Sequence, residues 1–262
     1  MQDGGARTTM NKARSVLETP HQWALFLDID GTLVGIAPTP DTVRVPAPLV
    51  ALLQRLTRGL GGAMALLTGR HIANADALLS PLRLAAAGVH GTELRGDPGG
   101  EITRVAPPLA PHVAAAISDL EGIAPGVLIE RKVSGIAVHY RNAPFARPAI
   151  HAGLTAIVAA HGDLALRAGR KVLELGPKGY SKGSALRWFA ARAPFSGRRP
   201  IMIGDDVGDE PALEAAERLG GVGLRVAGEY FSEAASDFEN IAGVHAWLEA
   251  LADALATTRA VG

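Results

Sequence analysis

The chain has 262 residues, of which 48% are hydrophobic and 20% are charged, as in an ordinary globular protein of one large or two smaller domains. Its 26 basic and 26 acidic residues cancel, so the sequence lacks the basic excess of a general nucleic-acid binder, and we expect no nucleic-acid partner. The absence of cysteine excludes disulfides, thiolate zinc sites and cysteine nucleophiles.

The N-terminal part of the chain predicts a tail followed by alternating strands and helices. Residues 1–20 are polar and rich in Gly and Thr, which is typical of a flexible tail. They lack the apolar core of a signal peptide, and no apolar run is long enough to cross a bilayer, so we expect a cytoplasmic protein without membrane contact. Three apolar runs predict buried strands at 23–29, 63–67 and 84–89. The two segments between them predict helices at about 49–56 and 72–79.

This βαβαβ order with fully apolar strands predicts a parallel sheet covered by helices on both faces. From about residue 106 to 176 the pattern changes to a helix, two strands, a second helix and two further strands. The helix–strand alternation returns after residue 177, with a strand at 201–204. We therefore expect an α/β protein with a doubly wound core (21–105 and 177–262) and an inserted α+β cap domain of αββαββ order (106–176). Such a cap can exclude water from a site built on the core.

Two groups of acids follow predicted strands. Asp28 and Asp30 come after the run 23–29, and Asp205, Asp206 and Asp209 come after the run 201–204. An isolated buried carboxylate costs several kcal/mol, so such acids are usually paired, bound to a metal or used in a reaction. The i, i+2 spacing of the first pair directs both side chains to one side of an extended segment.

Polar residues also follow the other two predicted strands: Thr68 and Arg70 after one, His90 and Glu93 after the other. In open α/β sheets ligands bind beyond the carboxyl ends of the strands, so these clusters predict one shared active site. A single acid pair of this kind is more often a solvated turn, and it is the coincidence of four clusters at one sheet edge that favours a site.

An oxygen-only ligand set such as Asp28, Asp205 and a backbone carbonyl suits Mg²⁺. Lys182, at a predicted helix start, can supply a fixed positive charge, unless it is a solvated surface lysine. Thr68 can donate a hydrogen bond to a phosphoryl oxygen. These residue types together indicate phosphoryl transfer assisted by a cation.

In this order the motifs resemble those of the haloacid-dehalogenase superfamily of phosphohydrolases, which has a Rossmann-like core. Within that superfamily the chain is similar, from about residue 23 to 250, to the trehalose-6-phosphate phosphatase family. The segments that carry the resemblance are LDIDGTL (27–33), LLTGR (66–70), AGVHGTE (87–93), ERKVSGIAVHYR (130–141), VLELGPKGYSKGSAL (172–186) and GDDVGDE (204–210).

The resemblance implies roles for the core residues. Asp28 would be the nucleophile that forms a phosphoaspartyl intermediate, and Asp30 the general acid and then the general base. Mg²⁺ would be held by Asp28, Asp205 and the Asp30 carbonyl, with Asp206 and Asp209 as further or supporting metal residues. Thr68 and Lys182 would hold the phosphate.

The resemblance also implies substrate-binding residues. In the cap these are Glu130, Lys132, His139 and Glu174, which would reach sugar hydroxyls; in the core they are Arg70, His90 and Glu93. Glu130 and Lys132 could instead be surface pairs across strands, and His139 a strand histidine that faces the cap helices. The chain departs from the family pattern at Gly208, which replaces a hydroxyl residue, and at Gly176, where a basic residue is usual.

These implications predict a Mg²⁺-dependent phosphatase that releases trehalose and phosphate from trehalose 6-phosphate, a small-molecule partner. One alternative is the same chemistry on another glycosyl phosphate, such as sucrose phosphate or glucosylglycerol phosphate. A second is a non-catalytic sensor of sugar phosphates. The pattern does not indicate an oligomeric state.

Overall fold

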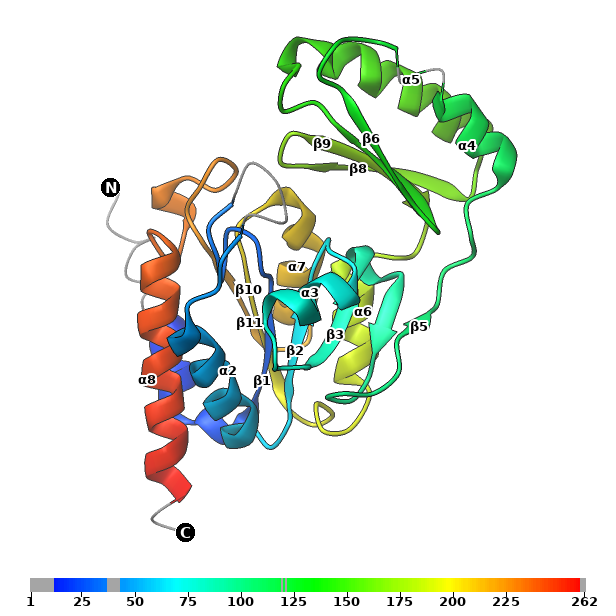
Figure 1. The fold of residues 1–262 in the computed structure, drawn as a ribbon. Helices are drawn as coiled ribbons and strands as arrows, with labels where there is room; N and C mark the ends of the chain where they lie inside the picture. Colours follow the sequence, from blue (N-terminus) through cyan, green and yellow to red (C-terminus); the bar gives the residue numbers. More distant parts are fainter. Residues whose placement is uncertain (1–11, 37–42, 119, 121, 260–262) are drawn as a thin grey trace. The chain divides into compact units, whose positions relative to one another are not determined.

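The computed structural model describes residues 12–36, 43–118, 120 and 122–259, and the chain divides into two compact units (Figure 1). The core unit comprises residues 1–103 and 181–262, and the second unit, here called the insert, comprises residues 104–180. Each unit has its own hydrophobic core. The insert therefore interrupts the core unit in sequence, as the change of pattern near residue 106 predicts.

The core unit is built on a seven-stranded sheet with the order β11-β10-β1-β2-β3-β4-β5. The pairs from β11 through β3 are parallel, whereas β4 is antiparallel to β3. The strands are β1 (Trp23–Leu27), β2 (Met64–Leu67), β3 (Ala85–Gly88), β4 (Glu93–Arg95), β5 (Thr103–Arg104), β10 (Arg199–Gly204) and β11 (Val222–Arg225). The sequence analysis does not predict β4 and β5, because they are too short to show a period.

Helices cover both faces of this sheet, as the apolar strands require. On one face α2 packs with α8, and on the other α6 packs with α7 (Figure 1). The helices of the core unit are α2 (Ala47–Gly59), α3 (Ile72–Leu78), α6 (Lys182–Ala190), α7 (Glu210–Arg218) and α8 (Ile241–Arg259). Short 3-10 turns are η1 (Pro20–Gln22), η3 (Val89–Gly91), η5 (Val207–Asp209) and η6 (Glu233–Ala235). The doubly wound core is thereby confirmed.

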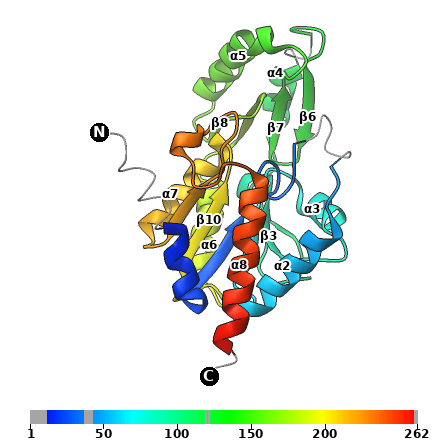
Figure 2. The same cartoon turned by 90° about the vertical axis from the view of Figure 1, so that its left-hand side faces the viewer.

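The expectation of a flexible tail over residues 1–20 is wrong for its second half. Residues 12–18 are helical and lie beside α8 (Figure 2), and the Val16 side chain is fully buried. The Trp247 indole donates a hydrogen bond to the Ala13 carbonyl at 3.0 Å. A few apolar residues in a polar segment are enough for docking onto an existing core. Residues 1–11 of the expected tail lie outside the described residues.

The insert is a four-stranded antiparallel sheet with the order β6-β7-β9-β8. Its elements run α4 (Pro111–Ser118), β6 (Leu128–Lys132), β7 (Gly135–His139), η4 (Pro144–Ala146), α5 (Arg147–Ala160), β8 (Leu164–Gly169) and β9 (Val172–Pro177). Alternate apolar residues of the sheet join α4 and α5 in one buried cluster, so both helices cover the same face. The αββαββ order is confirmed. Among the described helices, none combines the length and the apolar character needed to cross a bilayer.

Candidate active site

The acidic clusters meet where the winding of the core sheet reverses direction. From β1 the chain winds outward through β2 to β3, and from β10 it winds the other way to β11. Asp28 directly follows β1 and Asp205 directly follows β10, its parallel neighbour; the Asp28 amide donates to the Ile203 carbonyl at 3.1 Å. This position is the topological switch point at which doubly wound sheets bind ligands.

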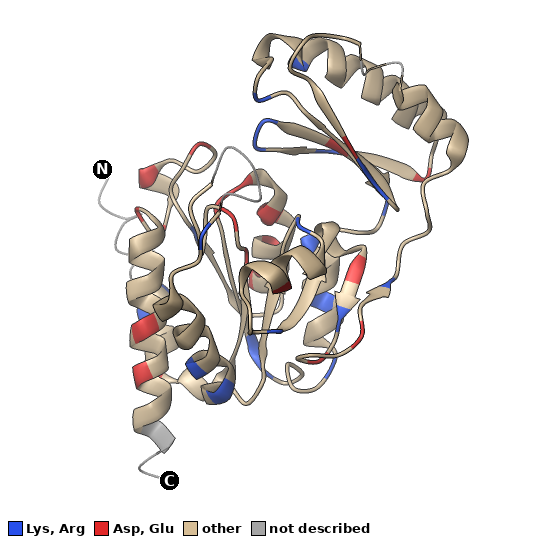
Figure 3. Ribbon diagram, in the orientation of Figure 1, with Lys and Arg blue, Asp and Glu red and all other residues tan. Residues whose placement is uncertain are grey.

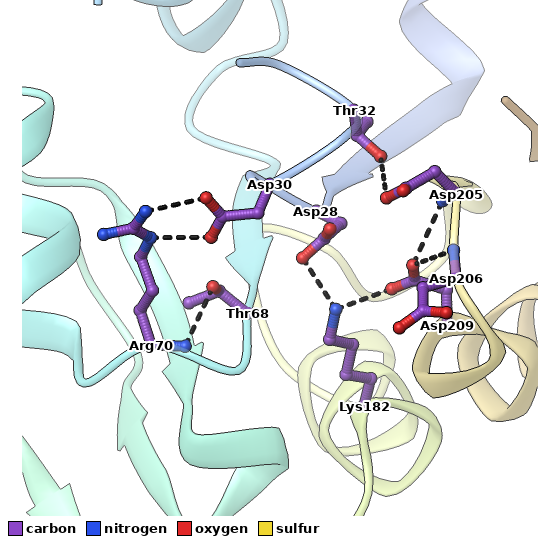
Figure 4. Close-up of polar contacts among 9 residues, drawn as sticks. All are labelled: Asp28, Asp30, Thr32, Thr68, Arg70, Lys182, Asp205, Asp206 and Asp209. Carbon is purple, nitrogen blue, oxygen red and sulfur yellow. Dashed lines mark hydrogen bonds and ion pairs between the residues drawn. The ribbon is translucent and has the colours of Figure 1, made fainter. Parts of the chain in front are cut away.

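The Gly31-Thr32 pair places the loop after β1 directly against Asp205. Figure 4 shows the contact of Thr32 with Asp205. Gly31 has a φ of +92°, and a Cβ atom built on it would lie 2.0 Å from a carboxylate oxygen of Asp205. Only glycine satisfies both the left-handed backbone and this close approach. Thr32 then donates its hydroxyl to Asp205 Oδ1 at 3.4 Å. The residues after the first acid pair thus position the second acid cluster.

Lys182 is the buried cation of the site. It begins α6, whose N-terminus is closed by a capping box between Ser181 and Ser184. The Lys182 Nζ lies 2.6 Å from Asp28 Oδ1 and 2.6 Å from Asp209 Oδ1, and the side chain is only 5% exposed (Figure 4). Burial by itself lowers the pKa of Lys182, but the charges of Asp209 and Asp28 and their hydrogen bonds raise it above its ordinary value. The solvated-lysine alternative is therefore wrong.

Negative charge exceeds positive charge around Asp28. Burial is the main cause that raises the pKa of Asp28 well above its ordinary value; Asp209 and Asp205 add repulsion, and Lys182 opposes both effects. Carboxylate oxygens of Asp28, Asp205 and Asp209 all lie within 4.8 Å of one another. Three buried carboxylates around one lysine form a donor set of hard oxygen ligands that fits a divalent cation such as Mg²⁺.

Asp209 has a different role from Asp28 and Asp205. Its Oδ1 contacts Lys182, and its Oδ2 accepts from the backbone amides of Asp205 and Asp206, both at 3.1 Å. It therefore holds the turn after β10 in shape. The side chains of Asp30 and Asp206, which the sequence analysis includes among the metal residues, do not belong to the cluster.

Asp30 is held by Arg70 from the loop after β2. Arg70 donates through Nε to Asp30 Oδ2 at 2.6 Å and through Nη2 to Asp30 Oδ1 at 2.7 Å, a bidentate pair (Figure 4). The Arg70 amide in turn donates to Thr68 Oγ1 at 3.1 Å. The structure thus gives Arg70, expected as a substrate-binding residue, a second function: it fixes the direction of the Asp30 carboxylate.

Glu93 and His90 lie near the start of α3. Glu93 is buried, accepts from the Ile72 amide at 3.1 Å and contacts His71 Nδ1 at 2.9 Å, so it anchors the first turn of α3. His90 has a left-handed backbone (φ 52°, ψ 35°), as do few residues other than glycine. Its imidazole lies beside Gly69 and Gly208, where added Cβ atoms would approach it to 2.9 and 3.5 Å. Substrate roles for Glu93 and His90 stay predictions.

The four residues that the sequence predicts in the cap form one cluster on the insert sheet, together with Arg167. We call this set, Glu130, Lys132, His139, Arg167 and Glu174, the charged face; the strand register and the buried cluster place it on the side of the sheet away from α4 and α5. Figure 3 shows acidic and basic positions along the strands of the insert sheet. Lys132 Nζ lies 2.9 Å from Glu174 Oε1, and His139 Nε2 lies 3.0 Å from Glu130 Oε2. The hydrogen bond from His139 is the main cause that lowers the pKa of Glu130.

The contacts of these residues bear on the alternatives. Glu130 and Lys132 do pair across strands, as one alternative predicts, Glu130 with His139 and Lys132 with Glu174. Their substrate roles stay predictions. His139 points away from the helices, so it is not a histidine that packs under them. The sequence analysis does not identify Arg167; only the register of the β8–β9 hairpin, which places it opposite Glu174, indicates its position.

The core site combines two acids after β1, a hydroxyl residue after β2, a buried lysine at the start of α6 and an acidic cluster after β10. On a doubly wound sheet with an inserted unit, this arrangement defines a phosphoryl-transfer site of the haloacid-dehalogenase type.

Comparison with known proteins gives the particular family. A family model described as trehalose-phosphatase matches residues 26–238. A probable trehalose-phosphate phosphatase of Sinorhizobium fredii is 43% identical over 215 residues, which cover 78% of this chain and 77% of that protein. The trehalose-6-phosphate phosphatase of Escherichia coli is 36% identical over 246 residues, which cover 92% of each chain. The chain belongs to the trehalose-phosphatase family, and it is a phosphatase.

Solved structures agree with this fold. The C-terminal domain of C. albicans trehalose-6-phosphate phosphatase superposes with a TM-score of 0.74 at 19% sequence identity and covers 96% of each chain. A haloacid-dehalogenase-like hydrolase from B. subtilis superposes with a TM-score of 0.64 at 16% identity, over 87% of this chain and 99% of that one. The fold class expected from the sequence is therefore confirmed. The family model and the relatives confirm the resemblance and the enzyme class, so the sensor alternative is wrong.

Proposed function

We propose that this protein hydrolyses trehalose 6-phosphate to trehalose and phosphate in a Mg²⁺-dependent reaction, as a step of trehalose biosynthesis, and that the phosphoryl group passes through Asp28. The observation that carries the mechanism is the contact of Asp28 with Lys182 at the switch point, beside the second acidic cluster. The substrate is supported by the names of relatives 36% and 43% identical to this chain.

In the first step a carboxylate oxygen of Asp28 attacks the phosphorus atom, and the bond from phosphorus to the sugar oxygen breaks. Asp30 gives its proton to the leaving oxygen, so that trehalose leaves as a neutral alcohol. Lys182 keeps the attacking carboxylate in place through its 2.6 Å contact with Oδ1. Thr68 and Lys182 hold the transferred phosphoryl group.

In the second step a water molecule attacks the phosphorus atom of the phosphoaspartyl intermediate, and the bond from phosphorus to Asp28 breaks. Asp30, now ionised, takes the proton from this water. A positioned group that moves a proton in this way accelerates a reaction by roughly 10²–10⁴-fold. The bidentate contact with Arg70 fixes the direction of the Asp30 carboxylate.

Asp28 and Asp205 would hold Mg²⁺, with the Asp30 carbonyl as a further ligand and Asp206 as support. When bound, the cation shields the charge of the phosphoryl group from the attacking carboxylate. Asp209 and Lys182 keep the two ligand-bearing loops in position, and Thr32 does the same for the Asp205 side chain.

The charged face of the insert would bind the sugar. Carboxylates accept hydrogen bonds from hydroxyl groups, and the lysine, histidine and arginine donate to hydroxyl oxygens, so a mixed set suits a polyhydroxylated ligand. Buried polar groups of this kind reject analogues that lack the matching hydroxyl. Lys132 and Glu174, whose side chains are 7% and 15% exposed, are the members best shielded from water.

Phosphate release from a panel of sugar phosphates tests this function. The panel holds trehalose 6-phosphate, sucrose phosphate, glucosylglycerol phosphate and glucose 6-phosphate, each assayed with Mg²⁺ and with excess chelator. We expect trehalose 6-phosphate to have the largest kcat/KM and the chelator to abolish its hydrolysis. Equal kcat/KM across the panel would refute the substrate, and full activity in chelator would refute the metal assignment.

A further inference from the structure

Gly176 leaves a gap on the charged face of the insert sheet, and the side chain of Arg167 fills it. A Cβ atom built on Gly176 would lie 3.0 Å from Arg167 Nη1, so the guanidinium occupies the space where a side chain at position 176 would begin. Gly176 is not among the residues with a positive φ. Its backbone therefore does not require glycine, and the missing side chain has the effect of making room for the arginine.

The Arg167 guanidinium is held in a defined orientation at this place. Its Nη2 donates to the Pro177 carbonyl at 2.6 Å and to the Tyr180 carbonyl at 2.8 Å. In the β8–β9 pairing Arg167 lies directly opposite Glu174, which in turn contacts Lys132 at 2.9 Å. Burial lowers the pKa of Arg167, and the charge of Glu174 opposes that shift. A planar cation anchored at one nitrogen presents its remaining donors in a fixed direction.

We propose that Arg167 is a sugar-binding residue, and that it supplies from β8 the positive charge that a side chain at position 176 would otherwise supply from β9. The positive charge then comes from β8 and not from β9, but it lies at the same place on the charged face. At position 176 this chain lacks the basic residue that is usual in the family pattern, and the arginine of the facing strand takes its place. The ligand chemistry is a pair of adjacent hydroxyl oxygens, which the guanidinium fork matches. This inference rests on the proposed function.

The test measures kcat and KM for trehalose 6-phosphate, and for p-nitrophenyl phosphate, which has no sugar. Arg167→Gln should lower kcat/KM for trehalose 6-phosphate by about ten- to a hundredfold, mainly through KM, and leave p-nitrophenyl phosphate hydrolysis unchanged. Adding Gly176→Lys to this variant should regain most of the loss, because the new side chain enters the space that the arginine has left. Arg131→Gln is the matched control, since Arg131 contacts Ser118 of α4 on the helix side of the same sheet.

Several results would overturn the proposal. Arg167→Gln could behave like the control, or lower the rates on both substrates together with the melting temperature; Arg167 would then only hold the segment 177–180. A double variant as weak as Arg167→Gln would show that the two positions do not share one cation. A wild type that hydrolyses p-nitrophenyl phosphate but not trehalose 6-phosphate refutes the proposed substrate instead, and the variants are then compared on the best sugar phosphate of the panel.

Discussion

The core site and the charged face of the insert use the same kinds of side chain in opposite ways. In the core, Asp28, Lys182 and Asp209 are 6%, 5% and 0% exposed and share one short-range network. On the charged face, Glu130 and His139 are 45% and 40% exposed and contact each other. The core charges follow strand ends or begin a helix, whereas the insert charges lie on the strands themselves. Desolvated charges on rigid ends suit bond making, and a row of charges on a sheet surface suits recognition.

The difference follows from topology. A parallel sheet with helices on both faces leaves only its strand ends for polar groups, so every functional residue of the core collects at one edge. An antiparallel sheet with helices on one face leaves alternate residues of every strand for a polar surface. Substitutions in the two regions should therefore separate the chemical step from the choice of substrate.

The largest effect is expected from Asp28→Asn. The amide cannot form the phosphoaspartyl bond, so turnover should fall on the order of 10⁴–10⁶-fold for trehalose 6-phosphate and p-nitrophenyl phosphate alike. Phosphate release measures hydrolysis of trehalose 6-phosphate, and nitrophenol absorbance measures hydrolysis of p-nitrophenyl phosphate. Circular dichroism of the variant serves as the folding control. Retention of either activity would break the assignment of chemistry to the core.

Lys182→Met tests how the core charges affect stability. It leaves Asp28 and Asp209 buried together without their shared cation, and the free energy of unfolding should fall by roughly 3–5 kcal/mol in metal-free protein. Urea denaturation measures this change. The control is Lys178→Met on the insert, whose exposed ammonium contacts the Gly162 carbonyl and whose loss should have little effect. Similar losses for both variants would remove the energetic contrast between the two regions.

Glu174→Gln tests the charged face. It removes the carboxylate that Lys132 contacts, so kcat/KM for trehalose 6-phosphate should fall about ten- to a hundredfold. Hydrolysis of p-nitrophenyl phosphate should not change, because this substrate has no sugar to bind. Glu101→Gln, at an exposed position of the core unit, serves as a charge-matched control. Equal losses on both substrates would place Glu174 in the chemical step or in folding rather than in recognition.

The smallest effect is expected for Glu130→Gln on stability. The pKa of Glu130 is lowered below its ordinary value of 4.5, so its ionised form contributes stability above that pH and loses it as the pH falls through the folded value. Because the pair with His139 is well exposed, the difference from wild type should stay below about 1 kcal/mol at pH 7 and vanish once the pH has fallen below the folded pKa. Urea denaturation at several pH values measures it. A larger difference, or one independent of pH, would show that Glu130 is not a surface pair.

Much of the fold could be predicted because it depends on local pattern. Apolar runs locate β1, β2, β3 and β10, and the leucines of α2 show the helical period. The segments that escape prediction are short or polar. β4 has three residues, and the helix over 12–18 depends on contacts with α8 rather than on its own sequence. Docking of this kind is a tertiary effect that no local window records.

The residues of the site likewise divide into those that local sequence predicts and those that it does not. The acids after β1 and β10, Thr68 and Lys182 could all be predicted from their positions, because strand ends of a parallel sheet share one edge. The partners of these residues could not. Arg70 binds Asp30 across 40 residues of sequence, and Arg167 reaches the place of a side chain on the next strand.

The sequence by itself determined the class of fold, the family and the candidate chemical residues, because apolar period and strand-end acids are properties of short segments. Only the tertiary structure decided which charges neutralise one another: Lys182 between Asp28 and Asp209, Arg70 on Asp30, and Lys132 on Glu174. It also decided that Arg167 lies beside Gly176. The physical reason is distance. The interaction of two charges depends on their separation and their burial, and both are set by the packing of segments far apart in the chain.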